Sequence, residues 1–212
     1  MVRPRTVSDE QILETACRCF LEHGPSVSTE TIASQLGVSA QALLKRFQTK
    51  RELLLASVLP PESAPWIPVV EAGPDDRPVR VQLSEIVSQL AEYYVEIAQR
   101  MSVLQFAGFS PDDLKGRYSE LPPLRNIRIV SNWFERAAER GLIRTTEFSV
   151  VAMTVLSALH GPAMLTGFLG KHPTGHSAED YVDAVIDLIL DGLNERFCEQ
   201  DIAETMAASE SL

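Results

Sequence analysis

Apolar residues in this chain recur at intervals of three and four, which is the spacing of an α-helix. The stretch from Val79 to Arg100 is the clearest case, because Leu83, Ile86 and Leu90 fall on one side of a helix. No stretch alternates apolar and polar residues with the period of two that a half-buried strand requires. The pattern therefore predicts an all-α protein of about nine helices.

Charge and proline divide the 212 residues into two parts. Residues 1–56 carry seven basic and six acidic residues, whereas residues 57–212 carry twelve basic and 23 acidic residues. Prolines crowd residues 60–78, where we expect no regular helix. We expect one domain over 1–56 and a second, acidic one over 57–212, with anion binding confined to the first.

Capping residues mark three short helices near the N-terminus. Ser8 and Gln11 form a capping box that opens the first helix, and Ser28 opens the second. Gly37 can take the positive φ that ends a helix, and Ser39 caps the next helix at once. A helix, a short Gly-Val-Ser turn and a second helix is the helix-turn-helix pattern.

The third of these helices carries the main functional prediction. Leu43 and Phe47 are four residues apart and share one face, while Gln41, Ala42 and Lys45 lie on the other side. An amide can pair with adenine, a methyl group can contact thymine, and an ammonium can reach guanine or phosphate. An ordinary solvated helix face is the alternative, and the preceding turn and the local basic cluster favour the groove-facing interpretation.

A fourth helix is expected to begin at Thr49, where Thr49 and Glu52 have capping-box spacing. The unpaired N–H groups at its start would attract an anion. Lys50 stands in this first turn, where the helix dipole disfavours a cation slightly, and a bound phosphate would offset that effect. We therefore predict a phosphate contact at the start of this helix.

Residues 8–59 resemble the DNA-binding domain of the tetracycline-repressor (TetR) family of bacterial transcription regulators. The resemblance is carried by Ile32-Ala33, Leu36-Gly37-Val38-Ser39, Leu43, Phe47 and Thr49-Lys50-Arg51-Glu52-Leu53-Leu54. The sequence departs from the family at Leu44, where an aromatic residue that touches the DNA backbone is usual, and at Arg46 and Gln48. Arg46 is a candidate for a replacement phosphate contact. The predicted DNA-binding residues are Arg3, Arg5, Ser39, Ala40, Gln41, Ala42, Leu44, Lys45, Arg46, Thr49 and Lys50.

The resemblance implies that residues 57–212 form a helical ligand-binding and dimerisation bundle. Its last two long helices, from Thr146 to about Gly170 and from Glu179 to Cys198, would form a four-helix interface with a second copy. Such a homodimer would read a palindromic operator in double-stranded DNA. A row of four aspartates in the last helix has metal-site spacing, but we expect it to be a solvated face.

A small apolar ligand of unknown identity is expected to bind inside this helical body. The candidate contacts are mostly large apolar side chains with two polar anchors, namely Tyr94, Met101, Phe106, Phe109, Trp133, Phe134, Met153 and His160. Taken singly, a residue of each of these types is more often a core residue than a ligand contact. Ligand binding would shift the fourth helix and change the spacing of the two reading heads.

Several function classes are disfavoured. The histidines lack metal-ligand spacing, and no nucleophile elbow or phosphate loop is present, so we expect no enzyme, metal or cofactor. Three cysteines fit a reducing compartment such as the cytoplasm. Residues 150–170 are uncharged and long enough to span a membrane, but Ser157, His160 and Pro162 favour a buried interface helix.

The sequence thus predicts a dimeric, ligand-responsive repressor. Two alternatives stay open. One is a helix-turn-helix regulator that a protein partner controls without small-molecule sensing, which a body without a cavity would favour. The other is a helical-bundle enzyme or carrier whose N-terminal motif is incidental, which failure to bind any DNA would favour.

Overall fold

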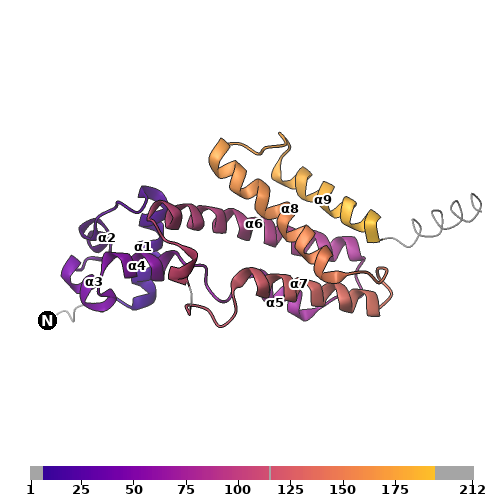
Figure 1. Cartoon of the computed structure of the whole chain (residues 1–212), viewed down its shortest axis with the longest axis horizontal. Helices are drawn as coiled ribbons and strands as arrows, with labels where there is room; N and C mark the ends of the chain where they lie inside the picture. Colours follow the sequence, from indigo (N-terminus) through magenta and orange to yellow (C-terminus); the bar gives the residue numbers. More distant parts are fainter. Residues whose placement is uncertain (1–6, 115, 194–212) are drawn as a thin grey trace, which may run out of the picture. The chain divides into compact units, whose positions relative to one another are not determined.

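The computed structural model describes residues 7–114 and 116–193, and every regular element in them is helical. The order is α1 (Asp9–His23), α2 (Thr29–Leu36), α3 (Ala40–Phe47), α4 (Lys50–Val58), α5 (Trp66–Ala72), α6 (Val79–Phe106), the 3₁₀ helix η1 (Pro111–Leu114), α7 (Pro122–Glu139), α8 (Phe148–Leu169) and α9 (Ala178–Leu193). The prediction of an all-α fold with about nine helices is confirmed within these residues (Figure 1).

The contacts between residues divide the chain into two compact units. The first unit contains Met1–Pro61 together with Glu96–Arg117, and the second contains Glu62–Val95 together with Tyr118–Leu212. The long helix α6 therefore contributes its first part to the second unit and its last part to the first unit. The domain boundary expected after residue 56 stays a prediction.

The first unit is held by local caps and one apolar core. Ser8 and Gln11 form the expected capping box, and Ser28 and Ser39 accept hydrogen bonds from the backbone N–H three residues further on. These caps satisfy N–H groups that have no partner inside a helix. Fully buried side chains from α1 to α4 fill the core, joined by Val103 and Leu104 of α6; the largest are Phe20, Ile12, Ile32, Leu43, Leu53 and Leu55.

The proline-rich stretch contains a helix, contrary to expectation. α5 begins at Trp66, so Pro68 lies in its first turn. Backbone N–H groups in the first turn have no partner within the helix, and a proline there removes no helical hydrogen bond. Trp66 and Val70 of this helix are buried. The prediction that residues 60–78 lack a regular helix is therefore wrong.

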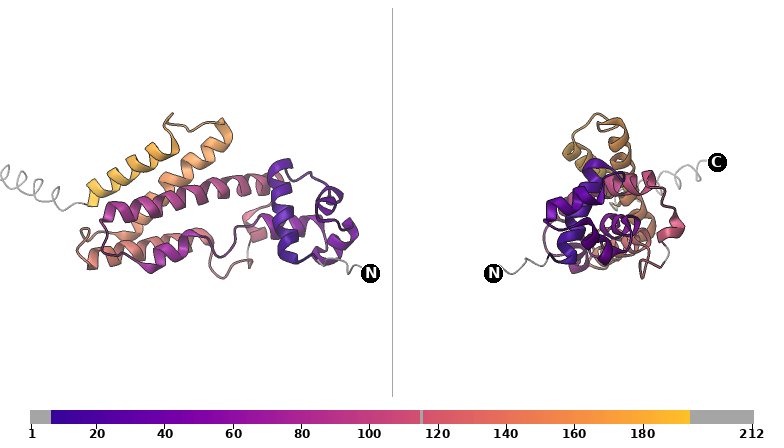
Figure 2. Two further views of the ribbon diagram at one scale, coloured as in Figure 1. Left: turned by 180° about the vertical axis from the view of Figure 1, so that it is seen from behind. Right: turned by 90° about the vertical axis from the view of Figure 1, so that its left-hand side faces the viewer.

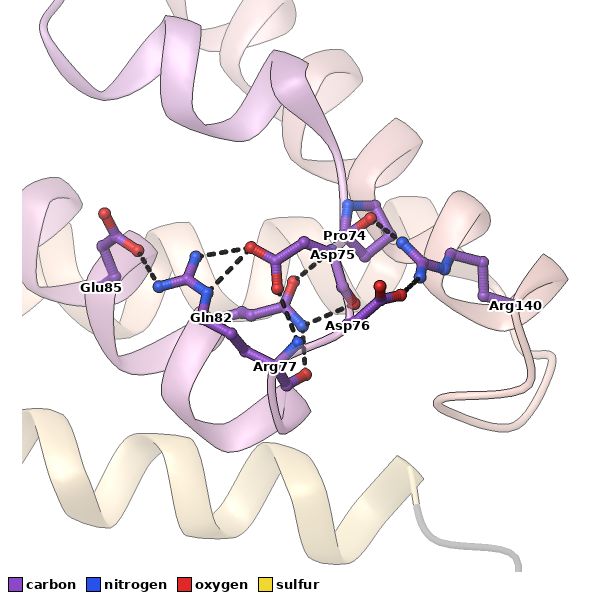
Figure 3. A network of polar contacts seen from close by, with 7 residues as sticks. All are labelled: Pro74, Asp75, Asp76, Arg77, Gln82, Glu85 and Arg140. Atoms are coloured by element: carbon purple, nitrogen blue, oxygen red, sulfur yellow. Dashed lines mark hydrogen bonds and ion pairs between the residues drawn. The ribbon is translucent and has the colours of Figure 1, made fainter.

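In the second unit, two arginines of α7 and its C-cap residue Arg140 bind backbone carbonyl groups around α5. Arg125 donates to the Glu62 carbonyl, Arg136 donates to those of Glu71 and Ala72 at 2.9 Å each, and Arg140 donates to that of Pro74. Figure 3 shows the last of these contacts beside the turn that leads into α6. These long-range bonds hold α5 against α7.

The same turn is organised by the buried side chain of Gln82, which is 3% exposed. Its Oε1 accepts from the Asp75 N–H at 2.8 Å, and its Nε2 donates to the carbonyls of Asp75 and Arg77 at 3.2 and 2.6 Å (Figure 3). One side chain thus completes the hydrogen bonds of the backbone at the start of α6.

The helices α8 and α9 lie side by side, as both views show (Figures 1 and 2). Tyr181 of α9 donates to the Ala158 carbonyl of α8 at 2.8 Å. Pro162 lies inside α8, which continues through it. Ser177 caps α9 by accepting from the Asp180 N–H at 3.0 Å. The predicted end of α9 at Cys198 lies outside the described residues. By length and composition alone, α8 is apolar enough to cross a membrane.

Candidate nucleic-acid interface

The turn between α2 and α3 has the geometry that the sequence predicts. Gly37 takes a left-handed conformation, with φ 66° and ψ 29°, and the Val38 N–H donates to the Ala33 carbonyl at 3.1 Å. Ser39 then accepts from the Ala42 N–H at 3.2 Å and starts α3. The helix-turn-helix therefore depends on a glycine that tolerates positive φ and on a serine that caps.

The two sides of α3 differ sharply in burial. Leu43 is completely buried, and Phe47 packs against the same core. Gln41, Ala42 and Lys45 are exposed on the other side. With Ser39 and Leu44, they line one open surface hollow. Ala40 is half-buried. The hydrophilic side of the helix is therefore free to meet a ligand.

Arg46 is engaged within its own unit. Its Nη1 donates to the Val7 carbonyl at 2.6 Å and to the Asp9 carboxylate at 3.1 Å. The side chain thus links the end of α3 to the residues that lead into α1. Arg3 and Arg5, which the sequence predicts to be DNA contacts, lie outside the described residues.

A tight turn joins α3 to α4. The Thr49 N–H donates to the Phe47 carbonyl at 2.7 Å, and Gln48 between them has φ 62° and ψ −57°. Within the described chain, Gln48 is the one non-glycine residue with positive φ. This geometry is a γ-turn of the rare, strained kind. Such strain often accompanies function.

Only one of the two hydrogen bonds of a capping box forms at the start of α4. Thr49 Oγ1 accepts from the Glu52 N–H at 3.0 Å, as the capping box predicts. The Glu52 carboxylate does not return the bond; it pairs with Arg117 at 2.9 Å. Thr49 is exposed and Lys50 is half-buried at this helix start.

The basic side chains around this surface differ in whether they form ion pairs within the protein. Neither Lys45 nor Lys50 forms an ion pair with any residue that the structure describes. The pKa of Glu30 is lowered chiefly by its own backbone N–H and by the Ser28 hydroxyl, and to a smaller extent by the charge of Lys50. Both lysines are thus available to an external anion.

Arg51 has a structural role that the sequence analysis missed. Its Nη2 lies 3.0 Å from the Asp113 carboxylate, and its guanidinium lies over the Phe109 ring at 3.9 Å. The Ser110 N–H and hydroxyl, together with Arg51, lower the pKa of Asp113 to about 2. No local sequence signal indicates this pairing, because its partners are 62 residues apart.

Residues 12–57 match the sequence profile described as bacterial regulatory proteins, tetR family. This segment is a tetR-family helix-turn-helix domain. The resemblance drawn from its turn, core and cap residues is confirmed.

Solved structures of bacterial transcriptional regulators, two of them described as TetR-family proteins, share the fold of most of the chain. PfmR of Thermus thermophilus is 24% identical, with a TM-score of 0.54 over 87% of this chain and 100% of that chain. A transcriptional regulator of Cytophaga hutchinsonii is 17% identical, with a TM-score of 0.61 over 87% and 97%. A TetR/AcrR-family regulator of Thermobifida fusca is 21% identical, with a TM-score of 0.55 over 86% and 96%. No curated protein matches the chain significantly.

The eight predicted ligand contacts are divided between the two compact units. Met101, Phe106 and Phe109 belong to the first unit, where Met101 and Phe109 pack against the core of the TetR-type domain and Phe106 is 82% exposed. The other five belong to the second unit, where Trp133 and Phe134 are buried and Met153 is exposed. The division arises because the end of α6 packs with the first unit.

Two of the predicted contacts do meet, namely Tyr94 and His160. Their rings stack with centroids 5.1 Å apart, and Tyr94 is buried while His160 is exposed. Burial raises the pKa of Tyr94 to about 12, against the smaller opposing effect of its hydrogen bond with Asn126. Tyr94 therefore stays neutral at physiological pH.

The aspartate row of α9 has its own partners. Asp183 and Asp187 pair with Arg80, and Asp180 accepts from the Ser177 hydroxyl at 2.7 Å. Among the described residues, no group of three histidine, cysteine or acidic side chains is placed to hold a metal ion.

Proposed function

We propose that this protein is a bacterial, cytoplasmic transcription regulator that binds a palindromic operator as a homodimer and represses transcription. The observation that carries the proposal is the division of α3 into a completely buried side at Leu43 and an exposed side at Gln41, Ala42 and Lys45. Side chains of these types, on a helix that follows a helix-turn-helix turn, match the donor and acceptor pattern of the major groove.

Phosphate contacts would fix the register of α3 in the groove. Lys50 and the N–H groups at the start of α4 are candidates, together with Arg3 and Arg5. Arg46 is not assigned this role, because its guanidinium already binds Val7 and Asp9. The base contacts would then come from Gln41, Ala42 and Lys45.

The second unit leaves an apolar surface that a second copy would cover. Large apolar side chains of α8 and α9 are exposed, among them Val150, Met153, Leu165, Phe168 and Leu188 at 61, 52, 48, 87 and 73%. Exposed apolar side chains grouped on one helix pair mark an association surface. A homodimer through α8 and α9 would cover this surface, and no membrane is needed to explain the apolar character of α8.

Control by a small ligand in the second unit is part of the proposal, and one observation favours the alternative of a protein partner. The apolar void among α5, α6, α7 and α8 measures about 10 Å³. That volume holds no more than one water molecule. A ligand would therefore have to separate these helices, which is how its binding would change the DNA-binding heads.

Selection of bound sequences from random DNA tests the proposal. We expect a palindromic site, and we expect Gln41→Ala to lose about 1–3 kcal/mol on that site while relaxing the preference at one position of each half-site. Lys50→Ala should weaken binding to all sequences and reduce the salt slope by about one. Equal loss of operator and random DNA in Gln41→Ala would contradict base reading. A monomer by sedimentation at micromolar concentration would contradict the paired heads.

A further inference from the structure

Three side chains of the second unit carry buried polar atoms that have no hydrogen-bond partner among the described residues. They are the indole Nε1 of Trp66, the Nε and Nη2 of Arg125, and the Oδ1 of Asn126. Trp66 is 1% and Asn126 is 2% exposed. Buried polar groups are nearly always hydrogen-bonded, because burying them without a partner is destabilising. Two of these exceptions, Arg125 and Asn126, are adjacent in α7, and together the three point to a further binding partner.

The unused atoms of Arg125 have the shape of a carboxylate site. Its Nη1 donates to the Glu62 carbonyl, which leaves Nε and Nη2, the two donors on one edge of the guanidinium. The same edge of Arg128, one turn further along α7, holds a carboxylate: Nε and Nη2 donate to the two oxygens of Glu120 at 3.4 and 2.7 Å. Paired donors of this kind match the two oxygens of a carboxylate.

Glu120 forms no hydrogen bond with the Nε and Nη2 edge of Arg125. Its hydrogen bonds with Arg128 lower its pKa most, and the more distant charge of Arg125 adds to the effect. Both Glu120 oxygens are bonded to Arg128, whereas Nε and Nη2 of Arg125 have no partner in the part of the chain that the structure describes. Two buried donors of the half-buried Arg125 side chain therefore have no partner among the described residues, although an engaged anion lies in the same region.

Trp66 and Asn126 lie one helical turn from an apolar layer. Val70, Leu90 and Val130 line the void of about 10 Å³. Four residues from each of them, on the same face of its helix, stand Trp66, Tyr94 and Asn126 respectively.

Ring contacts and one hydrogen bond connect the polar layer. The Trp66 and Tyr93 rings are 6.0 Å apart, the Tyr93 and Tyr94 rings are 5.4 Å apart, and Tyr94 is hydrogen-bonded to Asn126. A polar end therefore continues into an apolar interior formed by α5, α6 and α7.

We propose that Arg125, with Trp66 and Asn126, binds the carboxylate head group of an amphiphilic ligand whose aliphatic chain enters the apolar layer. Arg125 supplies the bidentate contact, Trp66 donates one further hydrogen bond, and Asn126 accepts one from a protonated oxygen or a water. The inference rests on the proposed function only in taking this ligand as the effector of the regulator. Because the apolar void is small, the chain separates the helices as it enters, and its binding is tied to a change in conformation.

Isothermal titration of the full chain with decanoate and with decan-1-ol, in the absence of DNA, tests the site. Both probes carry the same aliphatic chain, and only one carries a carboxylate. We expect decanoate to bind at least tenfold more tightly than decan-1-ol. Arg125→Gln should weaken decanoate binding at least tenfold. The matched control Arg128→Gln, one turn away on α7, should change it less than twofold.

Trp66→Phe keeps an aromatic ring and removes the Nε1 donor, so it tests the site independently if Arg125→Gln does not fold. We expect Trp66→Phe to bind decanoate three- to tenfold more weakly than the unchanged protein. Absence of decanoate binding, equal binding of the two probes, or equal loss in the two arginine variants would overturn the proposal. DNA binding measured on the same samples separates the two proposals. A protein that binds decanoate without binding DNA leaves the site intact and refutes the regulator, and the opposite result refutes the site alone.

Discussion

The two units satisfy their polar backbone in different ways. In the first unit, Ser8, Ser28, Ser39 and Thr49 each cap a helix through a bond to the N–H three residues later. In the second unit, α5, α7 and α8 begin without a side-chain cap bond within the described chain. Its helix α9 does have such a cap, from Ser177. The second unit is distinguished by bonds to carbonyls 63–66 residues away in sequence, which Arg125, Arg136 and the α7 C-cap residue Arg140 donate. Local bonds can form before the chain folds, whereas long-range bonds need the fold already in place.

The largest expected effect on the free energy of unfolding concerns Gln82, which we compare with a second glutamine, Gln11. Gln82 is buried and bonds three backbone groups, while Gln11 is exposed and accepts from the Ser8 N–H at 3.0 Å. Gln82→Ala should lower the free energy of unfolding by about 2–4 kcal/mol, because it leaves backbone groups without partners. Gln11→Ala should lower it by only about 0.5–1 kcal/mol.

Urea unfolding of both variants measures these two values. Gln82→Glu serves as a further control, since it keeps the shape and the acceptor while removing the donor to the Asp75 and Arg77 carbonyls. Similar losses for Gln82→Ala and Gln11→Ala would refute the distinction between buried and exposed side chains that bond the backbone.

This contrast explains which parts of the molecule the sequence could predict. The caps and the Gly37 turn are visible locally, so the helix-turn-helix, the buried Leu43 and the exposed Gln41 followed from the spacing. The helix α5 was missed, because Pro68 is harmless only at its position in the first turn.

The partners of Arg46, Arg51 and Arg125 are 37 to 63 residues distant in sequence. No periodicity marks such pairs. The predicted ligand contacts also depended on which helices meet, so residues of suitable type proved to belong to different units.

A second prediction, of an intermediate effect on the free energy of unfolding, compares two glycines that each stand at the C-cap of a helix. Gly24 has φ 75° and ψ 179°, and Gly73 has φ 81° and ψ 178°, so the backbone penalty for alanine is the same. A Cβ at Gly73 would lie 2.1 Å from the Arg136 guanidinium, whereas one at Gly24 meets nothing within 4 Å. Gly73→Ala should therefore be less stable than Gly24→Ala by about 1–2 kcal/mol, through loss of the two Arg136 bonds.

Thermal and urea unfolding give this difference, and Arg136→Ala provides its check. If the lost Arg136 bonds account for the additional destabilisation, Gly73→Ala should destabilise the Arg136→Ala variant much less than it destabilises the unchanged protein. The loss of free energy of unfolding should then be about that of Gly24→Ala. An excess that persists without Arg136 would mean that the turn itself, and not the bonds from α7, distinguishes the two sites.

The smallest effect concerns strain at the turn between α3 and α4. Gln48 has φ 62° there, a conformation that glycine adopts without steric conflict. Relief of about 1–3 kcal/mol of strain is offset by about 0.5–1 kcal/mol for the greater freedom of glycine in the unfolded chain. Gln48→Gly should thus raise the free energy of unfolding by about 0.5 kcal/mol when both contributions are at the low ends of their ranges.

Gln48→Ala keeps a Cβ and should change stability by less than about 0.5 kcal/mol. The two variants also separate the structural role of the turn from its functional role. The Phe47–Thr49 bond fixes the start of α4, where the phosphate contacts are proposed, against the end of the reading helix. If the strained turn holds these two surfaces in register, Gln48→Gly binds the operator more weakly although it is more stable, while Gln48→Ala binds as the unchanged protein does. Unchanged operator affinity in a stabilised Gln48→Gly would mean that the strain serves no DNA contact.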